Sequence, residues 1–234
     1  MIVGAALCPH PPLLLRELTG GHDVGAGLRA ACLDALRTVL DLHPAEVVVV
    51  GGADAGGEPP AGAVLDVHAF GGPSPAPVAD GSGAPPGLPL SLGIGARLLD
   101  LAGWTGARRL HAVPWDAEPA HCLSLGRALA ARPTPTALLV LGDASARRAV
   151  RAPGHLDPRA ESFDAAVTRA VADGDARALA ATDPAAAADL LAAGRASWQV
   201  LAGALPSADA RLLHADDPFG VLYLVATWLP VPPG

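Results

Sequence analysis

His10 is the first residue whose type and setting could do chemistry, because it lies between prolines in the segment CPHPP at residues 8–12. Proline fixes φ at about −65° and biases the residue before it toward extended backbone. An apolar run of strand length, MIVGAAL at residues 1–7, precedes this segment. We therefore expect His10 at the carboxyl edge of a sheet, where open α/β folds bind ligands. An incidental turn histidine is the alternative.

Two further apolar runs are followed by polar side chains. The run EVVVVGG at residues 46–52 precedes Asp54, and the run TALLVLG at residues 136–142 precedes Asp143 and Ser145. Loops that leave buried strands commonly carry binding and catalytic residues. We therefore take Asp143 and Ser145 as candidate catalytic residues. One hypothesis is a hydrolase or transferase that works without a metal and uses these two residues with nearby arginines.

Three arginines follow Asp143, at positions 147, 148 and 151. Arg147 and Arg148 could bind a carboxylate or phosphate of a small substrate, because the planar guanidinium matches both groups bidentately. The alternative is a set of internal ion pairs, for which the same segment offers three carboxylates: Asp157, Glu161 and Asp164.

Several other side chains that could do chemistry can also be interpreted as core or surface residues. Tyr223, the only tyrosine, alternates with apolar residues in a strand-like segment, so its hydroxyl either reaches the site or packs in the core. Adjacent residues on a helix point about 100° apart, which favours a core Cys122 and a surface His121 over a shared metal site. Cys32 fits an apolar helical stripe, and we expect His68 to be a sheet residue.

The composition excludes several classes of protein. The chain has no lysine and no asparagine, so a Schiff-base or P-loop lysine is ruled out. The net charge of −7 argues against nucleic acid as a non-specific partner. Three cysteines in no C-x-x-C spacing argue against a disulfide framework. No apolar run has the length of a membrane span, and no basic segment opens the chain, so we expect a cytoplasmic protein without a membrane partner.

Strand and helix patterns alternate along the chain. Strands are predicted at residues 1–7, 46–52, 63–70, 109–114, 136–142, 211–214 and 221–228, and helices at 24–42, 91–103 and 120–132, with two more opened by Asp157-Pro158 and Asp183-Pro184. Hydrophobic residues make up 51% of the 234 residues. This alternation predicts an α/β sandwich of one domain over residues 1–234, with a largely parallel central sheet and helices on both faces.

Four segments give the chain a resemblance to a known family. They are AALCPHPPLLL near the start, LGDASARR…APGHLDPRAESFDAAV in the middle, GRASWQVLAG at 194–203 and DPFGVLYLVATW at 217–228. Together they resemble the LigB-like family of class III extradiol ring-cleavage dioxygenases, in particular an actinobacterial branch. The resemblance implies an oxidoreductase that uses non-haem Fe(II), held by two histidines and a glutamate, on a catechol-like substrate.

The resemblance implies a site in which most of the family's residues are replaced. The first metal histidine corresponds to His10. The second falls at residues 52–54, where Asp54 offers an oxygen ligand in place of imidazole. The acid/base histidine falls at Ala146, so that His155 is either its substitute or a histidine of the surface loop. The glutamate falls near Trp198, where the chain has Gly194, Arg195 and Ser197.

Two functional hypotheses follow from this pattern. The first is an iron enzyme, with Fe(II) or Zn²⁺ held by His10 and Asp54 and completed by Cys8, His121 or Cys122. The second is a protein without cofactor or catalysis that keeps the cleft to bind a small molecule or a partner. The resemblance also implies a homo-oligomer or a separate small subunit as a partner, as in some members of the superfamily.

Overall fold

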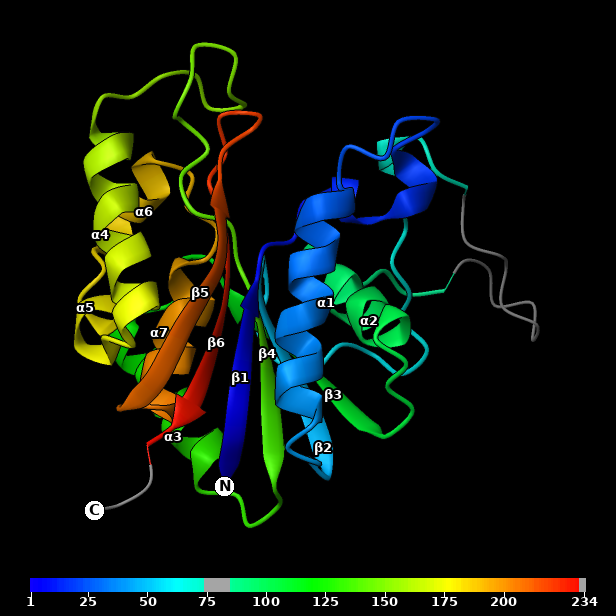
Figure 1. The fold of residues 1–234 in the computed structure, drawn as a ribbon, viewed down its shortest axis with the longest axis vertical. Helices are drawn as coiled ribbons and strands as arrows, with labels where there is room; N and C mark the ends of the chain where they lie inside the picture. Colours follow the sequence, from blue (N-terminus) through cyan, green and yellow to red (C-terminus); the bar gives the residue numbers. More distant parts are fainter. Residues whose placement is uncertain (74–84, 232–234) are drawn as a thin grey trace.

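A six-stranded mixed sheet forms the centre of the protein, which is described here by a computed structural model over residues 1–73 and 85–231 (Figure 1). The strands are β1 (Ile2–Cys8), β2 (Glu46–Ala53), β3 (Ala107–Pro114), β4 (Thr136–Leu141), β5 (Ala208–Asp216) and β6 (Tyr223–Pro230). Their order is β3-β2-β4-β1-β6-β5. The first four of these strands are parallel, whereas β6 runs antiparallel to both β1 and β5.

The parallel strands end together at one edge of the sheet. Cys8 of β1 pairs with Leu141 of β4, which also pairs with Gly51 of β2, and Ala53 pairs with Pro114 of β3. Every residue of β2 and β4 is buried, as expected for valine- and leucine-rich strands covered on both faces. The loops that follow β1, β2, β3 and β4 therefore meet at this carboxyl edge, which is uppermost in Figure 1.

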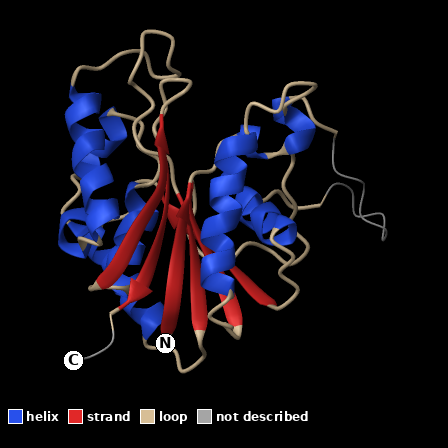
Figure 2. Ribbon diagram, in the orientation of Figure 1, coloured by secondary structure: helices blue, strands red, loops and turns tan. Residues whose placement is uncertain are grey.

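Helices cover both faces of the sheet, which confirms the predicted α/β sandwich (Figure 2). One face carries α1 (Ala26–Leu40) and α2 (Leu90–Leu101). The other side carries α3 (Pro119–Ala130), α4 (Arg159–Asp173), α5 (Ala176–Ala180), α6 (Pro184–Asp189) and α7 (Arg195–Ala204). None of the helices in the described ranges is long and apolar enough to cross a membrane.

Close packing of α3 and α7 fixes the position of α7. A β-carbon at Gly126 of α3 would lie 2.1 Å from the carbonyl oxygen of Val200, and one at Gly203 of α7 would lie 2.3 Å from that of Leu123. Only glycine allows such an approach of two backbones. The first turn of α7, which begins at Arg195, is joined to the end of β4: the Gly194 N–H donates to the carbonyl of Asp143 at 2.8 Å, and the Ser197 hydroxyl donates to that of Leu141 at 2.7 Å.

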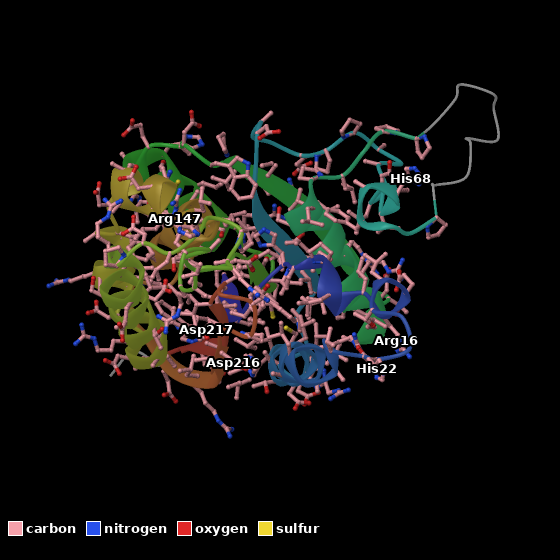
Figure 3. The ribbon with its side chains drawn as sticks, turned by 90° about the horizontal axis from the view of Figure 1, so that it is seen from above. Arg16, His22, His68, Arg147, Asp216 and Asp217 are labelled. Carbon is pink, nitrogen blue, oxygen red and sulfur yellow. The ribbon has the colours of Figure 1, made fainter. Side chains whose placement is uncertain are left out.

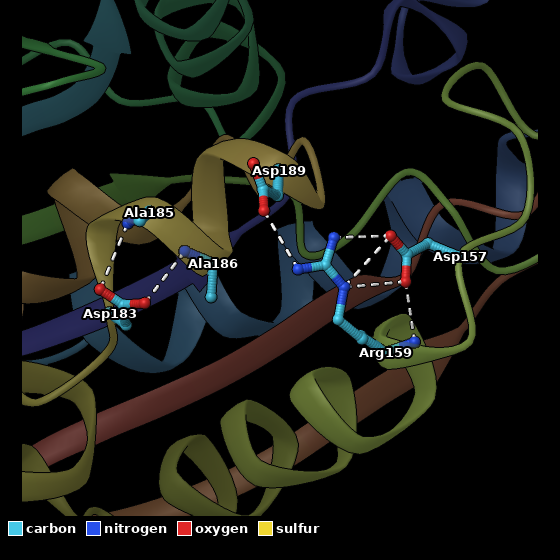
Figure 4. Close-up of polar contacts among 6 residues, drawn as sticks. All are labelled: Asp157, Arg159, Asp183, Ala185, Ala186 and Asp189. Atoms are coloured by element: carbon cyan, nitrogen blue, oxygen red, sulfur yellow. Dashed lines mark hydrogen bonds and ion pairs between the residues drawn. The ribbon is translucent and has the colours of Figure 1, made fainter.

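The two predicted proline-opened helices are present (Figure 4). Asp183 caps α6, because its carboxylate accepts hydrogen bonds from the N–H groups of Ala185 and Ala186. At α4 the helix begins at Arg159, one residue after Pro158. The Arg159 side chain pairs with both Asp157 and Asp189, and so joins the start of α4 to the end of α6.

The predicted strand at residues 63–70 is wrong. Val64 makes one isolated bridge to Gly87, and His68–Phe70 form a 3₁₀ helix in which His68 is exposed. The Asp66 carboxylate accepts a hydrogen bond from the His68 N–H at 2.8 Å. Such local bonds compete with strand pairing. His68 is therefore not a sheet residue, and residues 74–84 of the same Gly/Pro-rich stretch lie outside the described residues.

Candidate functional site

His10 and Asp143 lie side by side at the carboxyl edge, where β1 and β4 end. The His10 N–H donates to Oδ1 of Asp143 at 2.8 Å, and the His10 Nδ1 lies 3.6 Å from the same oxygen. His10 is only 5% exposed, and its buried Nδ1 has no hydrogen-bond partner within residues 1–73 and 85–231. The structure thus brings together two of the residues that the sequence singled out, which are 133 positions apart.

Trp115, which was not predicted from the sequence, completes this arrangement from the end of β3. Its indole stacks on the His10 ring with centroids 6.2 Å apart and planes at 24°. Its backbone N–H donates to the carbonyl of Ala53 at 3.0 Å. The indole also covers Gly52, where a β-carbon would lie 1.9 Å from Cζ3 of the ring. The signal in the sequence was the position of Trp115, directly after the last residue of a predicted strand.

The charge of Asp143 acts on two buried side chains, Tyr223 and Cys32. Tyr223 is 4% exposed, and burial raises the pKa of its hydroxyl, with a further increase from the charge of Asp143. Burial also raises the pKa of the Cys32 thiol, and the neighbouring Cys8 and Asp143 raise it further. Both groups therefore stay protonated at neutral pH. Tyr223 and Cys32 lie in the same core cluster, on the α1 side of the sheet.

Ser145 is turned toward α4. Its hydroxyl donates to Oδ2 of Asp164 at 2.6 Å and its N–H donates to Oδ1 at 3.0 Å. Both residues are buried. Burial raises the pKa of Asp164, although the hydrogen bonds from Ser145 and the charge of Arg148 act in the opposite direction. These bonds anchor the loop after β4 to α4.

The arginine cluster is divided between internal ion pairs and the surface. Arg148 pairs with Asp164 at 3.5 Å and with Asp217, which confirms one of the predicted pairings. Arg147 is half-buried, and its buried Nε has no acceptor in the described part of the chain. Figure 3, which looks down on the carboxyl edge, shows Arg147 and Asp217 over one half of the sheet and His68 at the opposite periphery.

Asp54 and His155 are both exposed. The Nδ1 of His155 makes a 2.8 Å hydrogen bond with the carbonyl of Val150, and His155 has a positive φ of 60°. No hydrogen bond or ion pair between described residues joins Asp54 or His155 to His10. Cys122 is buried and His121 is exposed, as the helical spacing predicted.

The donor set at this edge does not fit a centre of two histidines and one carboxylate. Gly52 lies under the Trp115 indole, so a side chain at this position has no room. Arg195, a cation, stands in the segment where the resemblance implies a glutamate. Within the described ranges, no group of three or more histidine, cysteine, aspartate or glutamate side chains is placed to hold a metal ion.

A cavity of about 550 Å³ opens next to Trp115. Its walls come from the loop after β3 and from the segment that runs from α6 to the first residue of α7. The lining residues are mostly small and apolar: Trp115, Asp116, Pro184, Ala185, Ala187, Ala188, Leu191, Ala192, Ala193 and Arg195. Because Trp115 contacts His10 and also lines this cavity, the His10–Asp143 pair and the cavity are neighbouring parts of one edge of the sheet.

The comparisons with known proteins bear on the fold alone. No family model matches the chain, and no curated protein matches it. Among solved structures, the chain is similar to the uncharacterized protein JW3007 from Escherichia coli K12, with a TM-score of 0.61 and 15% sequence identity. The similarity covers 97% of this chain and 99% of that one, so it extends over the whole α/β architecture.

Proposed function

We propose that the protein binds a small organic molecule at the carboxyl edge of its sheet, without cleaving an aromatic ring. The observation that carries this proposal is the position of Trp115. Its indole covers Gly52, stacks on His10 and forms one wall of the 550 Å³ cavity. The same side chain therefore occupies space beside His10 and shapes an adjacent binding cavity.

The cavity has the properties of a small-molecule site. Cavities that bind such ligands typically measure about 300–1,000 Å³ and combine apolar walls with a few polar groups. Here alanine methyl groups and Leu191 form the apolar walls, and Asp116 and Arg195 are the charged residues. Figure 4 shows that α6, which supplies part of the wall, is tied to the start of α4 by the bonds of Arg159. This attachment supports a cavity that exists before the ligand binds.

A variant that fills the cavity tests the proposal. Ala188 lines the cavity and is exposed, so an Ala188→Phe side chain can occupy the space without entering the core. We expect ligand-detected NMR with a fragment library to find compounds that bind the wild-type protein and not Ala188→Phe. The matched control is Ala165→Phe, on an exposed position of α4 outside the cavity lining. A library whose hits all bind Ala188→Phe as well would contradict the proposal.

An Fe(II)-dependent ring-cleaving enzyme is the second candidate. The observation that favours it is the buried Nδ1 of His10, which has no hydrogen-bond partner among the described residues and lies 3.6 Å from Oδ1 of Asp143. No third ligand joins these two donors within the described ranges, so this candidate takes it from a second copy of the chain or from a separate small subunit. This candidate rests on the family resemblance of the sequence.

Metal content separates the two candidates. The protein is loaded with Fe(II) under anaerobic conditions, and iron is measured in the wild type and in His10→Ala. Our proposal expects no stoichiometric iron in either protein and no oxygen uptake with catechols. Stoichiometric iron that is lost in His10→Ala, together with oxygen uptake by the wild type, would overturn it in favour of the iron enzyme.

A further inference from the structure

Arg195 is a buried cation whose hydrogen bonds are incomplete. It is the first residue of α7 and is 3% exposed. Its guanidinium donates to the carbonyls of Ala117 and Trp115 and, at 3.1 Å, to Oε1 of Gln199. A guanidinium has five N–H groups. The Nε–H and the second N–H on Nη2 have no acceptor among the residues that the structure describes.

The positive charge of Arg195 is also unpaired. No carboxylate of residues 1–73 or 85–231 lies within ion-pair distance of it. A buried charge without a counter-ion is unfavourable, because it has lost the solvation of water. Its place at the N-terminus of α7 adds to this, because the helix dipole is positive there and repels a cation. An anion beside Arg195 would therefore relieve two unfavourable interactions at once.

Arg195 is one of the residues that line the 550 Å³ cavity. Arg195 lines the cavity together with four apolar surfaces that the ligand would meet: Trp115, Leu191, Pro184 and the alanines of α6 and the segment after it. Asp116 also lines it, but that side chain is exposed and forms no ion pair with a described residue. The walls suit an aliphatic chain, and the two unused N–H groups suit a single carboxylate.

We propose that this cavity binds an aliphatic monocarboxylate, with its carboxylate on Arg195 and its chain against Leu191 and the alanines. The inference rests on the proposed small-molecule function and names the chemical class of the ligand. A phosphate ligand fits less well, because a dianion calls for more donors than one guanidinium with two unused N–H groups. Among the described residues that line the cavity, Arg195 is the one with a cationic side chain.

Calorimetric titration with three compounds of equal chain length tests the charge requirement. The probes are octanoate, octanamide and octylamine, each below its micelle concentration. We expect octanoate to bind the wild-type protein at least about ten-fold more tightly than octanamide, since a charge-assisted hydrogen bond is worth about 1.4 kcal/mol or more. Octylamine is expected not to bind.

Two variants locate the binding site. Arg195→Met should abolish the preference for octanoate over octanamide, and Arg195→Lys should restore part of it. If Arg195→Met does not fold, Ala188→Phe still tests the location, because it should lower the affinity for octanoate at least ten-fold while Ala165→Phe leaves it unchanged.

The outcomes separate this inference from the proposed function. Equal binding of octanoate and octanamide, both blocked by Ala188→Phe, would overturn the carboxylate assignment and leave small-molecule binding in place. Octanoate binding that Ala188→Phe does not weaken would overturn the placement in the cavity. Binding of none of the three compounds would overturn the inference, and the fragment screen would then decide the proposed function by itself.

Discussion

The indole of Trp115 lies against the α-carbon of Gly52, so closely that a β-carbon at position 52 would fall 1.9 Å from Cζ3 of the ring. The contact joins the ends of β2 and β3. The same indole also stacks on the ring of His10. It explains why β2 has a glycine at position 52, after its four valines: the space above the backbone there is occupied by the indole of Trp115, which directly follows β3.

We first predict that Gly52→Ala destabilises the protein by about 1–3 kcal/mol, the usual cost of overpacking. The added methyl group displaces the Trp115 ring. In a Trp115→Ala background the same substitution should have little effect, because the clash is gone. Urea unfolding of the four proteins measures the coupling. Gly27→Ala is the control, since Gly27 lies in α1 with no atom near its missing β-carbon, and it should be neutral or stabilising.

We next predict that Asp143→Ala costs about 1–3 kcal/mol, because it leaves the buried His10 N–H without an acceptor. Asp143→Asn should cost less, since its side-chain oxygen still accepts this hydrogen bond. Asp54→Ala is the control, because Asp54 is exposed. The free energy of unfolding and the hydrogen exchange of the His10 amide provide the measurements. Equal costs for the substitutions at positions 143 and 54 would contradict the described contact.

The buried Asp164 carboxyl should make stability depend on pH. Burial raises its pKa above the ordinary value of 3.8. Between the unfolded pKa and the higher folded pKa, the folded protein keeps the Asp164 proton that the unfolded chain has lost. Stability is therefore highest below the unfolded pKa and falls as the pH rises through the folded pKa. Asp164→Asn should remove this slope in unfolding experiments over pH 3–7.

Ser145→Ala is the matched variant for this effect. It removes a hydrogen bond that favours the ionised Asp164, so the pKa of Asp164 should rise further and the loss of stability should extend to higher pH. An unchanged pH profile in both variants would contradict the role assigned to burial.

The last prediction concerns the Asp157–Arg159 pair of Figure 4. The Arg159 guanidinium lowers the pKa of Asp157 from 3.8 to about 2, with help from the Arg159 N–H. The stabilising effect of this pair is therefore present above pH 4 and is lost as the pH falls toward 2. In Arg159→Met, carboxyl NMR titration should show the Asp157 pKa moving back toward 3.8. Asp189→Asn is the control and should leave the Asp157 pKa low.

Local patterns predicted most of the fold. The apolar spacing predicted one helical face in α1 that is formed by Leu28, Cys32, Leu36, Val39 and Leu40. The first four are buried and Leu40 is partly buried. The error at residues 63–70 shows the limit of such patterns. The Asp66 carboxylate accepts a hydrogen bond from the His68 N–H, and among the described residues the segment makes only the single bridge from Val64 to Gly87.

The sequence pointed to the edge of the sheet where the candidate site lies, but only to some of the residues there. The ends of three apolar runs pointed to His10, Asp54 and Asp143 at one edge, and the structure joins the first and third of these directly. Trp115 was missed as part of the proposed site, and Arg195 was named only as a residue that stands where the resemblance implies a glutamate. Each is placed there by partners far away in the sequence.

The sequence by itself determined most of the strands and helices and the edge of the sheet where polar side chains gather, because periodicity, caps and breakers act over a few neighbouring residues. Only the tertiary structure decided that His10 meets Asp143, that Trp115 covers Gly52, and that Arg195 reaches the carbonyl of Trp115, 80 positions away. Those contacts depend on strand register and on how closely α7 approaches the sheet. Register and approach are set by packing of the whole core, which local sequence does not encode.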